Sequence, residues 1–545
     1  MPSTVHSRNM SESKDFTIHM TDEDQTLEKY KNPKASYKRK SLVRGVKEIC
    51  GEFCSNTSIH GFQYFGQQRP RKEICFWIIV FVISIYLCSS IIVRIYVKWR
   101  ESPVIVSFSD RSTPIWNIPF PRVTICPEVK RSINVLNGKN FTSDFNRTQL
   151  EDTLTLMHMC DAESLFEEEP LLRDMDFVRS LKRMLPEYDR YLLLCYWSGD
   201  WISCDRLFYP VYTDEGICYA FNSLEMAHMY RDDVVKSNMR EVPDDEWPIY
   251  DTGRWSLEEG YAAATDLDTY PRRLANSGAH AGLVVYLQCF PHELDYTCNG
   301  PMEGYKVMLH SPDDVPSVSK HFVRISMDKE VMIALKPKMI TTSPEVAAYE
   351  PAKRLCFMNK DRQLAFYKIY SQKNCERECL TNYTLKECGC VHFSMPRSND
   401  TPVCLENNID CQLYAQRWMS AYTLATVADT PSDDCNCLPA CTSLEYETEI
   451  SEGYYDAKAL KGYKKFYKYD FASPGGKTAV VSIYFKEIQF ITSRRSEVYG
   501  FTDLLANFGG VFGLFMGISI LSVVEILYHL SLRLWSNLTH GVGES

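Results

Sequence analysis

The sequence predicts a membrane protein in which two transmembrane helices flank a large, disulfide-rich α+β domain. Two apolar stretches, at 74–93 and 511–530, predict the helices. The third observation is that most of the 21 cysteines lie between these stretches. The 545-residue chain is 45% hydrophobic and 24% charged, which excludes a chain disordered throughout, and its formal net charge of −10 argues against nucleic-acid binding.

The first apolar stretch, from Ile74 to Val93, contains no charged side chain. A helix of about 20 residues covers the hydrocarbon core of a bilayer, so we predict a transmembrane helix over residues 74–96. A cleaved signal peptide is the alternative, but it would be shorter and would lie near residue 1.

Charge and cysteine placement indicate the orientation. Arg69, Arg71 and Lys72 precede the first helix, and the positive-inside rule places that end in the cytosol. Two crossings leave the cysteine-rich segment outside the cell, where disulfides are stable. The predicted segments are a cytosolic N-terminus (1–73), the first helix (74–96), an extracellular domain (97–500), the second helix (501–532) and a cytosolic tail (533–545), with N-glycosylation expected at Asn140, Asn146, Asn382 and Asn399.

The extracellular segment mixes strand and helix patterns. Helical patterns occur at 163–194 and 374–383. This interleaving favours one α+β domain over a string of small modules. Runs rich in β-branched residues predict strands at 104–108, 283–287, 331–335 and 480–485.

Cysteines crowd the part of this segment between Cys375 and Cys441. Zinc binding is one interpretation of such spacing, but only His392 could add a histidine ligand there. We therefore favour a ladder of disulfides that ties two antiparallel elements into a stiff rod.

The second apolar stretch differs from the first because it contains an ionisable residue and several small ones. Glu525 is costly in a bilayer unless it faces water or a partner, which makes it a functional candidate. Glycines and Ser519 in a span usually indicate close helix packing. Here Gly517, Ile518 and Ser519 lie just before the carboxylate. Unwound backbone beside water, together with a carboxylate, indicates a path for cations.

Several motifs give the chain, from about Ser55 to Leu530, a specific resemblance. They are His60-Gly61, FPRVTICPE (120–128), TDEGICYAFNS (213–223), CGCVHFSMPR (388–397), CNCLPACTSLEYETEIS (435–451) and LLANFGGVFGLFMGISILSVVE (504–525). With these motifs the chain resembles the degenerin and epithelial sodium channel family. WSLEEGY (255–261) and YPRR (270–273) resemble the invertebrate members gated by FMRFamide-type peptides.

The resemblance implies a homotrimeric, amiloride-sensitive sodium channel of the plasma membrane, with an ectodomain of palm, finger, knuckle and thumb. Gly517, Ile518 and Ser519 match the motif at the narrowest part of the pore, and Glu525 would form an acidic ring in the outer-to-middle pore. His60 and Gly61 match a cytosolic gating motif, and Ala506 matches a small residue whose enlargement holds the pore open. Sodium is then the permeant ion, and no cofactor is expected.

The resemblance also implies a set of disulfides. Cys289 and Cys298 lie outside this set but are close enough in sequence to pair, which leaves Cys160 as an odd thiol. The implied bridges are Cys126–Cys218, Cys195–Cys204, Cys356–Cys441, Cys375–Cys437, Cys379–Cys435, Cys388–Cys411 and Cys390–Cys404.

The expected ligand is an extracellular amidated neuropeptide of the RFamide type. Its arginine needs a carboxylate partner and its aromatic ends need an apolar cleft. The region the resemblance places in the finger offers both, although aromatic residues at helical spacing are more often core. The candidate residues are Phe166, Glu167, Glu168, Asp174, Phe177 and Tyr188.

Other functions remain open at this level. Acid-sensing members carry a histidine pair after the first span, and residues 97–110 contain none, which weakens gating by protons. Gating by another ligand or by mechanical load, and constitutive opening, are further alternatives. A cell-surface receptor without a pore would need neither 517–519 nor Glu525. An enzyme is not expected, because no nucleophile elbow, HExxH or phosphate loop occurs.

Overall fold

The protein is described by a computed structural model. Its chain divides into two compact units, one formed by residues 1–95 with 505–545 and the other by residues 96–504. The described residues are 50–66, 69–101, 104–130, 146–160, 177–184, 188–234, 255–262, 269–294, 298, 300–404, 408–427, 435–462, 475–498, 500–533 and 535.

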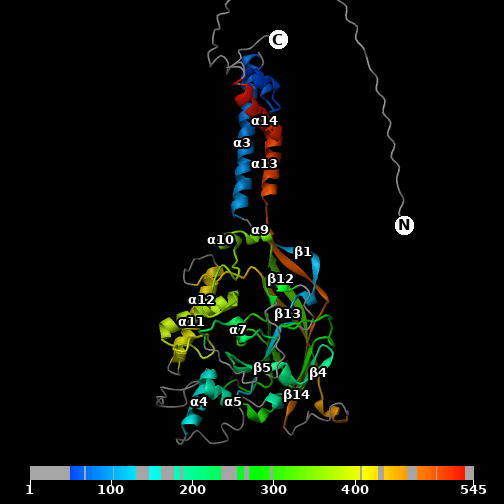
Figure 1. The fold of residues 1–545 in the computed structure, drawn as a ribbon, viewed down its shortest axis with the longest axis vertical. Coiled ribbons are helices and arrows are strands. Elements are labelled where there is room, and N and C mark those ends of the chain that lie inside the picture. Colours follow the sequence, from blue (N-terminus) through cyan, green and yellow to red (C-terminus); the bar gives the residue numbers. More distant parts are fainter. Residues whose placement is uncertain are drawn as a thin grey trace, which may run out of the picture. The chain divides into compact units, whose positions relative to one another are not determined.

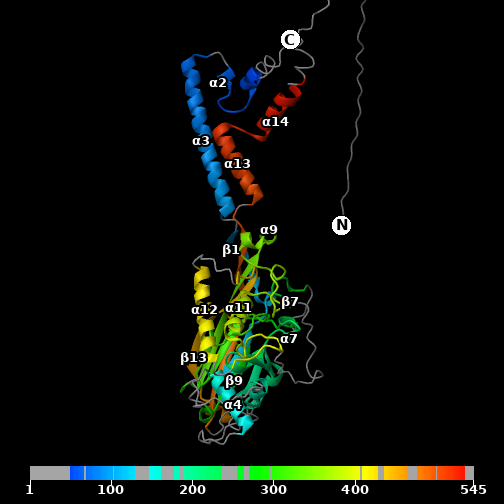
Figure 2. The same ribbon diagram turned by 90° about the vertical axis from the view of Figure 1, so that its left-hand side faces the viewer.

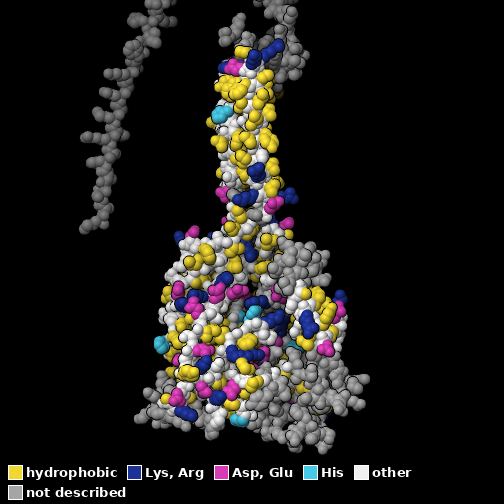
Figure 3. All heavy atoms as spheres, turned by 180° about the vertical axis from the view of Figure 1, so that it is seen from behind, with side chains coloured by type: hydrophobic (Ala, Val, Ile, Leu, Met, Phe, Trp, Pro, Cys, Tyr) yellow, Lys and Arg dark blue, Asp and Glu magenta, His cyan; other side chains and the backbone are white. Residues whose placement is uncertain are grey.

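The first unit is helical. Within the described residues, α3 (Arg71–Glu101) is the one helix long and apolar enough to cross a membrane by itself. Its side chains are turned outward, with Phe76 58% and Tyr86 71% exposed, as lipid contact requires. Figure 3 shows hydrophobic side chains over the visible face of this unit.

The second apolar stretch is broken. The sequence predicts one helix over 501–532, but the structure has α13 (Phe501–Met516) and α14 (Ile520–Tyr528), which ends in a π-helical turn at His529–Arg533. The two parts together are long and apolar enough for one span and are bent by 69° at the break (Figure 2).

The second unit is built around two β-sheets (Figure 1). The larger sheet has eight strands in the order β1-β15-β12-β14-β9-β3-β4, with β13 also paired to β12. Its strands are β1 (Val104–Pro114), β3 (Leu192–Trp197), β4 (Asp200–Ile202), β9 (Leu283–Cys289), β12 (Lys329–Thr342), β13 (Ser443–Tyr454), β14 (Lys477–Phe485) and β15 (Gln489–Glu497).

The smaller sheet has five strands in the order β11-β10-β2-β6-β5. Side chains from both sheets form one core cluster, for example Val123 and Val307 from the smaller sheet and Ile333 and Val481 from the larger. The strands of the smaller sheet are β2 (Arg122–Pro127), β5 (Phe208–Thr213), β6 (Gly216–Phe221), β10 (Tyr305–His310) and β11 (Val323–Ile325), and a separate hairpin joins β7 (Trp255–Ser256) to β8 (Gly260–Tyr261).

Helices pack in pairs outside the sheets. The capping box of Asn146 and Gln149 starts α4 (Arg147–Met159), which packs on α5 (Phe177–Met184). The second pair, α11 (Gln372–Cys388) and α12 (Ile409–Val427), is joined by stacked rings of Tyr383 and Trp418 with centroids 3.8 Å apart. The short helices are α2 (Gln63–Gly66), α6 (Tyr188–Tyr191), α7 (Met226–Met229), α9 (Pro344–Ala347) and α10 (Pro351–Arg354).

The element predictions succeed for the strands and partly fail for the helices. Each of the four predicted strand runs lies within a strand, in β1, β9, β12 and β14. The helix expected over 163–194 is wrong from Leu192 onward, because these residues pair with β9 as β3. The rest of that range is described only as α5 and α6. The sequence analysis also did not identify α12.

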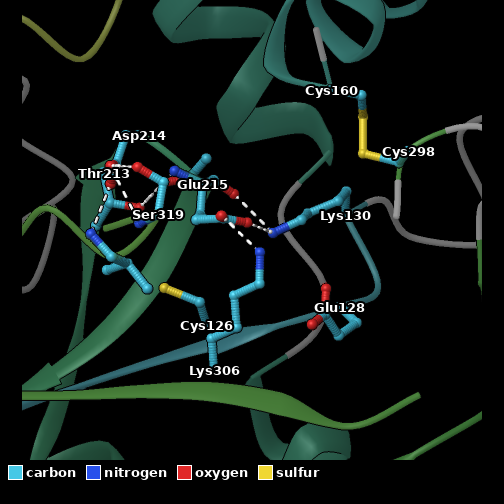
Figure 4. A network of polar contacts seen from close by, with 12 residues as sticks. Cys126, Glu128, Lys130, Cys160, Thr213, Asp214, Glu215, Cys298, Lys306 and Ser319 are labelled. Atoms are coloured by element: carbon cyan, nitrogen blue, oxygen red, sulfur yellow. Dashed lines mark hydrogen bonds and ion pairs between the residues drawn. A yellow bond between two sulfur atoms is a disulfide. The ribbon is translucent and has the colours of Figure 1, made fainter. Parts of the chain in front are cut away.

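The disulfides require one correction. All seven bridges implied by the resemblance are present in the structure. The eighth joins Cys160 to Cys298, so the expected pairing of Cys289 with Cys298 is wrong. Cys289 lies at the end of β9 and is 1% exposed, because it packs in the core cluster. Cys160 directly follows α4 and is bonded to Cys298 (Figure 4). Burial also raises the pKa of the free Cys289 thiol to about 11.

Candidate functional site at the break between α13 and α14

The break is set by one glycine and one serine. Gly517 has φ of +67°, in the left-handed region that only glycine adopts at little cost. Its N–H still donates to the Gly513 carbonyl at 3.0 Å, so helical bonding continues up to this residue. The turn at Gly517 then changes the direction of the chain before α14 begins.

Ser519 starts the new helix. Its hydroxyl accepts a hydrogen bond from the Ser522 N–H at 3.2 Å, and the Ser519 N–H donates to the Ser522 hydroxyl at 3.1 Å. This reciprocal capping satisfies two backbone donors that a helix start leaves free. The sequence Ser-Ile-Leu-Ser therefore specifies a helix start within an apolar stretch.

The segment before α3 lies against this break. The His60 N–H donates to the Met516 carbonyl at 2.8 Å, and Ile59 is only 5% exposed. A Cβ added at Gly517 would lie 2.8 Å from ring atoms of His60. The two motifs singled out in the sequence, His60-Gly61 and 517–519, therefore meet in one unit.

A second contact joins the same segment to α14. The Ser58 and Ser522 hydroxyls are 2.7 Å apart, and the Ser58 hydroxyl also donates to Glu525 Oε2 at 3.4 Å. Ser522 is fully buried and Glu525 is partly buried. Further along, Arg533 pairs with Glu52 at 3.1 Å.

The chemistry of this site suits a hard cation. Helix ends expose backbone carbonyls, which together with hydroxyls and a carboxylate are the ligands that such ions prefer. Backbone outside a helix at membrane depth is tolerated where protein or water satisfies it. Oxygen atoms at this site can therefore replace some of the water molecules around a hydrated cation, without a complete set of protein ligands around the ion.

The motif TDEGICYAFNS leads to a different kind of site, a buried polar network in the ectodomain (Figure 4). Glu215 pairs with Lys130 at 2.8 Å and with Lys306 at 2.6 Å. Burial raises the pKa of the Glu215 carboxyl, but the two lysines outweigh it and the pKa falls below its ordinary value. Asp214 accepts from the backbone of Val318 at 2.9 Å and from Ser319. Because both carboxylates are engaged by these partners, we assign this motif a role in stabilising the ectodomain fold.

Comparison with known proteins decides the family. The family model described as "Amiloride-sensitive sodium channel" matches residues 53–529, which is most of the chain. The chain belongs to the amiloride-sensitive sodium channel family. It is therefore an ion channel of the plasma membrane with a disulfide-rich, β-rich ectodomain, and its family is one of channels and not of enzymes.

Several known proteins are similar to this chain over most of their length. Pickpocket protein 28 of Drosophila melanogaster is 29% identical over 499 residues, which cover 90% of this chain and 79% of that protein. Sodium channel protein Nach of Drosophila melanogaster is 23% identical and the match covers 94% and 92%. Acid-sensing ion channel 1A of Danio rerio is 24% identical and the match covers 88% and 87%.

The predicted ligand-binding residues of this sodium channel family member are only partly described. Phe166, Glu167, Glu168 and Asp174 lie outside the described residues, as does the side chain of Tyr188. Phe177 is 5% exposed and packs in the cluster between α4 and α5. A side chain packed in the α4–α5 core offers little surface to a ligand, and the role of Phe177 in peptide binding stays a prediction.

The other predicted positions fall on the surface. Ala506 is exposed on α13, and Asn382 and Asn399 are exposed. Asn146 is exposed too, but its side chain caps α4 by accepting from the Gln149 N–H at 2.8 Å. Asn140 lies outside the described residues.

Sequence reasoning missed two residues at the break between α13 and α14. Ser522 and Ser58 make a part-buried contact between their hydroxyls, and neither was singled out. For Ser522 a signal was available, because Ser519 and Ser522 have the spacing of a capping box. For Ser58 there was none, since its partner is distant in the chain.

Proposed function

We propose that the chain forms a sodium-selective, amiloride-sensitive pore in which Gly517, Ile518 and Ser519 line the narrowest part and Glu525 supplies negative charge beside it. The observation that supports this proposal is the capped break at Gly517, where non-helical backbone at 517–519 interrupts the apolar stretch. His60 and Gly61 set the gating state through the contact between His60 and Met516. Ala506 lies on α13, where a larger side chain favours the open state.

The topology follows from the same proposal. α3 is the first span, and α13 with α14 is the second, so both termini lie in the cytosol. The bridged cysteines all lie between the spans, which agrees with an oxidising outer compartment. Glu525 and the break supply one side of a pathway, and three copies of the chain surround the pore.

Opening is by an extracellular RFamide-type neuropeptide. The peptide arginine pairs with carboxylates among Glu167, Glu168 and Asp174, and the finger then moves against the thumb helices α11 and α12. Disulfides brace this thumb, because Cys388 on α11 is bonded to Cys411 on α12, and Cys375 and Cys379 on α11 are bonded to Cys437 and Cys435. Because the disulfides stiffen the helix pair, a movement of the finger is passed on through α11 and α12 and is not lost in their bending.

The test is whole-cell current from this chain expressed alone. A panel of RFamide peptides, then acid, is applied at negative voltage in sodium, with amiloride as blocker. A peptide-evoked sodium current that amiloride blocks supports the whole proposal. Current on acid alone, or a standing current that amiloride blocks, retains the pore and refutes peptide gating. Unchanged peptide sensitivity in all three of the variants Glu167→Ala, Glu168→Ala and Asp174→Ala would refute the pairing with the peptide arginine.

A further inference from the structure

The hydroxyl of Ser522 takes part in two contacts at once. It accepts a hydrogen bond from the Ser519 N–H at 3.1 Å, which is half of the capping box that starts α14. It also lies 2.7 Å from the hydroxyl of Ser58, which belongs to the segment before α3 (Figure 2). A helix cap needs no partner 464 positions away in the chain, so the contact with Ser58 is additional to the cap.

Ser58 is held opposite Ser522 by contacts on both sides of it. The His60 N–H donates to the Met516 carbonyl at 2.8 Å, and Glu52 pairs with Arg533 at 3.1 Å. These contacts occur in reverse chain order, so the segment runs antiparallel to α14. The ion pair is partly exposed and therefore weak, which makes the backbone bond of His60 the main restraint.

A serine hydroxyl has one hydrogen to donate, and this limits how the group can be connected. The Ser58 hydroxyl donates to Glu525 Oε2 at 3.4 Å, a contact longer than the usual range of about 2.5–3.0 Å. With its hydrogen directed there, Ser58 accepts from the Ser522 hydroxyl, which itself accepts from the Ser519 N–H. The three contacts then form one chain from the Ser519 backbone to the carboxylate.

The same hydroxyls have a second arrangement. When a cation or a proton occupies the Glu525 carboxylate, the carboxylate attracts the Ser58 hydrogen less, and Ser58 can donate to Ser522 instead. Ser522 then donates to the Ser519 hydroxyl, which is 3.2 Å away. The direction of these hydrogens therefore depends on the charge at Glu525.

We propose that Ser58 and Ser522 are positioning residues for the pore, which hold Ser519 relative to Glu525 and so contribute to sodium selectivity. This inference rests on the proposed function of the break as the pore. Neither serine has to touch the ion. Ser58 is exposed whereas Ser522 is 0% exposed, so removing the Ser58 hydroxyl tests the role without changing a buried side chain.

The first experiment measures the sodium-to-potassium permeability ratio of the full-length channel from reversal potentials, with surface expression checked by biotinylation. A neutral hydrogen bond changes an equilibrium by a factor of about 2–12, so Ser58→Ala should lower the ratio by about that factor. Ser58→Thr keeps a hydroxyl and should keep the ratio. Ser55→Ala is the matched control, because the Ser55 hydroxyl bonds to the carbonyls of Gly51 and Glu52 in its own helical turn.

Ser522→Ala and the double variant with Ser58→Ala show whether the two hydroxyls act together. If they form one unit, the ratio of the double variant is no lower than that of Ser522→Ala alone. Effects that add in the double variant, or a wild-type ratio in Ser58→Ala, refute the positioning role. A wild type without current refutes the proposed pore, and the role in selectivity with it.

The second experiment tests the contact itself and needs no current. Ser58→Cys and Ser522→Cys are combined in a full-length chain that also carries Cys50→Ser and Cys54→Ser. Mild oxidation in membranes should link the two introduced thiols, which mass spectrometry detects as a joined pair of peptides. Ser55→Cys with Ser522→Cys should give no link. Absence of a link between positions 58 and 522, or equal linking in the control pair, refutes the contact and the proposal.

Discussion

Gly517→Ala is the sharpest test of the break between α13 and α14. Two costs follow from the structure. A side chain at φ of +67° costs about 1–2 kcal/mol, and the new Cβ would lie 2.8 Å from the His60 ring. His60 is exposed and can shift, so the backbone term dominates. A cost of about 1–2 kcal/mol changes an equilibrium about 5–30-fold.

The assay is sodium current normalised to the amount of channel at the cell surface. We expect Gly517→Ala to lower it about 5–30-fold and to weaken sodium selectivity, measured as the reversal potential in sodium and potassium. Gly513→Ala is the matched control, because a Cβ added there meets nothing within 4 Å. In the Gly517→Ala background, His60→Ala should restore only part of the current. Wild-type current from Gly517→Ala, or an equal loss from Gly513→Ala, would refute the reasoning.

Three further predictions test other parts of the molecule. Glu525→Gln removes the carboxylate beside Ser58 and should lower the sodium current while surface expression, measured by biotinylation, stays constant. Cys160→Ser opens a bridge that spans 138 residues and should lower the melting temperature more than Cys289→Ser, which opens none but places a hydroxyl in the core cluster. Burial, and then the adjacent aspartate, raise the pKa of Asp313 to about 7. The folded state therefore binds a proton more tightly than the unfolded chain, so this group's stabilising effect is lost as pH rises through about 7. Asp313→Asn should flatten that part of the melting temperature against pH, and an unchanged slope would contradict it.

Local patterns predicted the parts of this fold that local chemistry determines. The β-branched runs became strands because both faces of the central strands are buried, as in β14. The stretch 192–194 was assigned to a helix as the end of the helical pattern over 163–194, but it pairs with β9 as the start of β3. The partner of Cys298 depends on where α4 ends, which sequence proximity does not reveal.

The candidate site shows the same division. Glycine favours the left-handed backbone found at Gly517, and serine favours the helix start found at Ser519. The residue types alone therefore allow a break to be predicted at these positions. The contacts of Ser58 with Ser522 and of His60 with Met516 join opposite ends of the chain, and no short-range pattern encodes them. Phe177 was assigned to a ligand because it is aromatic, whereas its burial in the α4–α5 cluster could be seen only in three dimensions.

The pairing of β1 with β15 has a mechanical consequence. β1 begins shortly after α3, β15 ends shortly before α13, and the two antiparallel strands are in register from Val104 and Glu497 at this end. Tension that pulls the two helices apart would peel this ribbon open one hydrogen bond at a time, beginning at Val104. Tension that moves both helices together would load many hydrogen bonds at once in shear. The ribbon is thus compliant to separation of the two helices and stiff to their joint displacement.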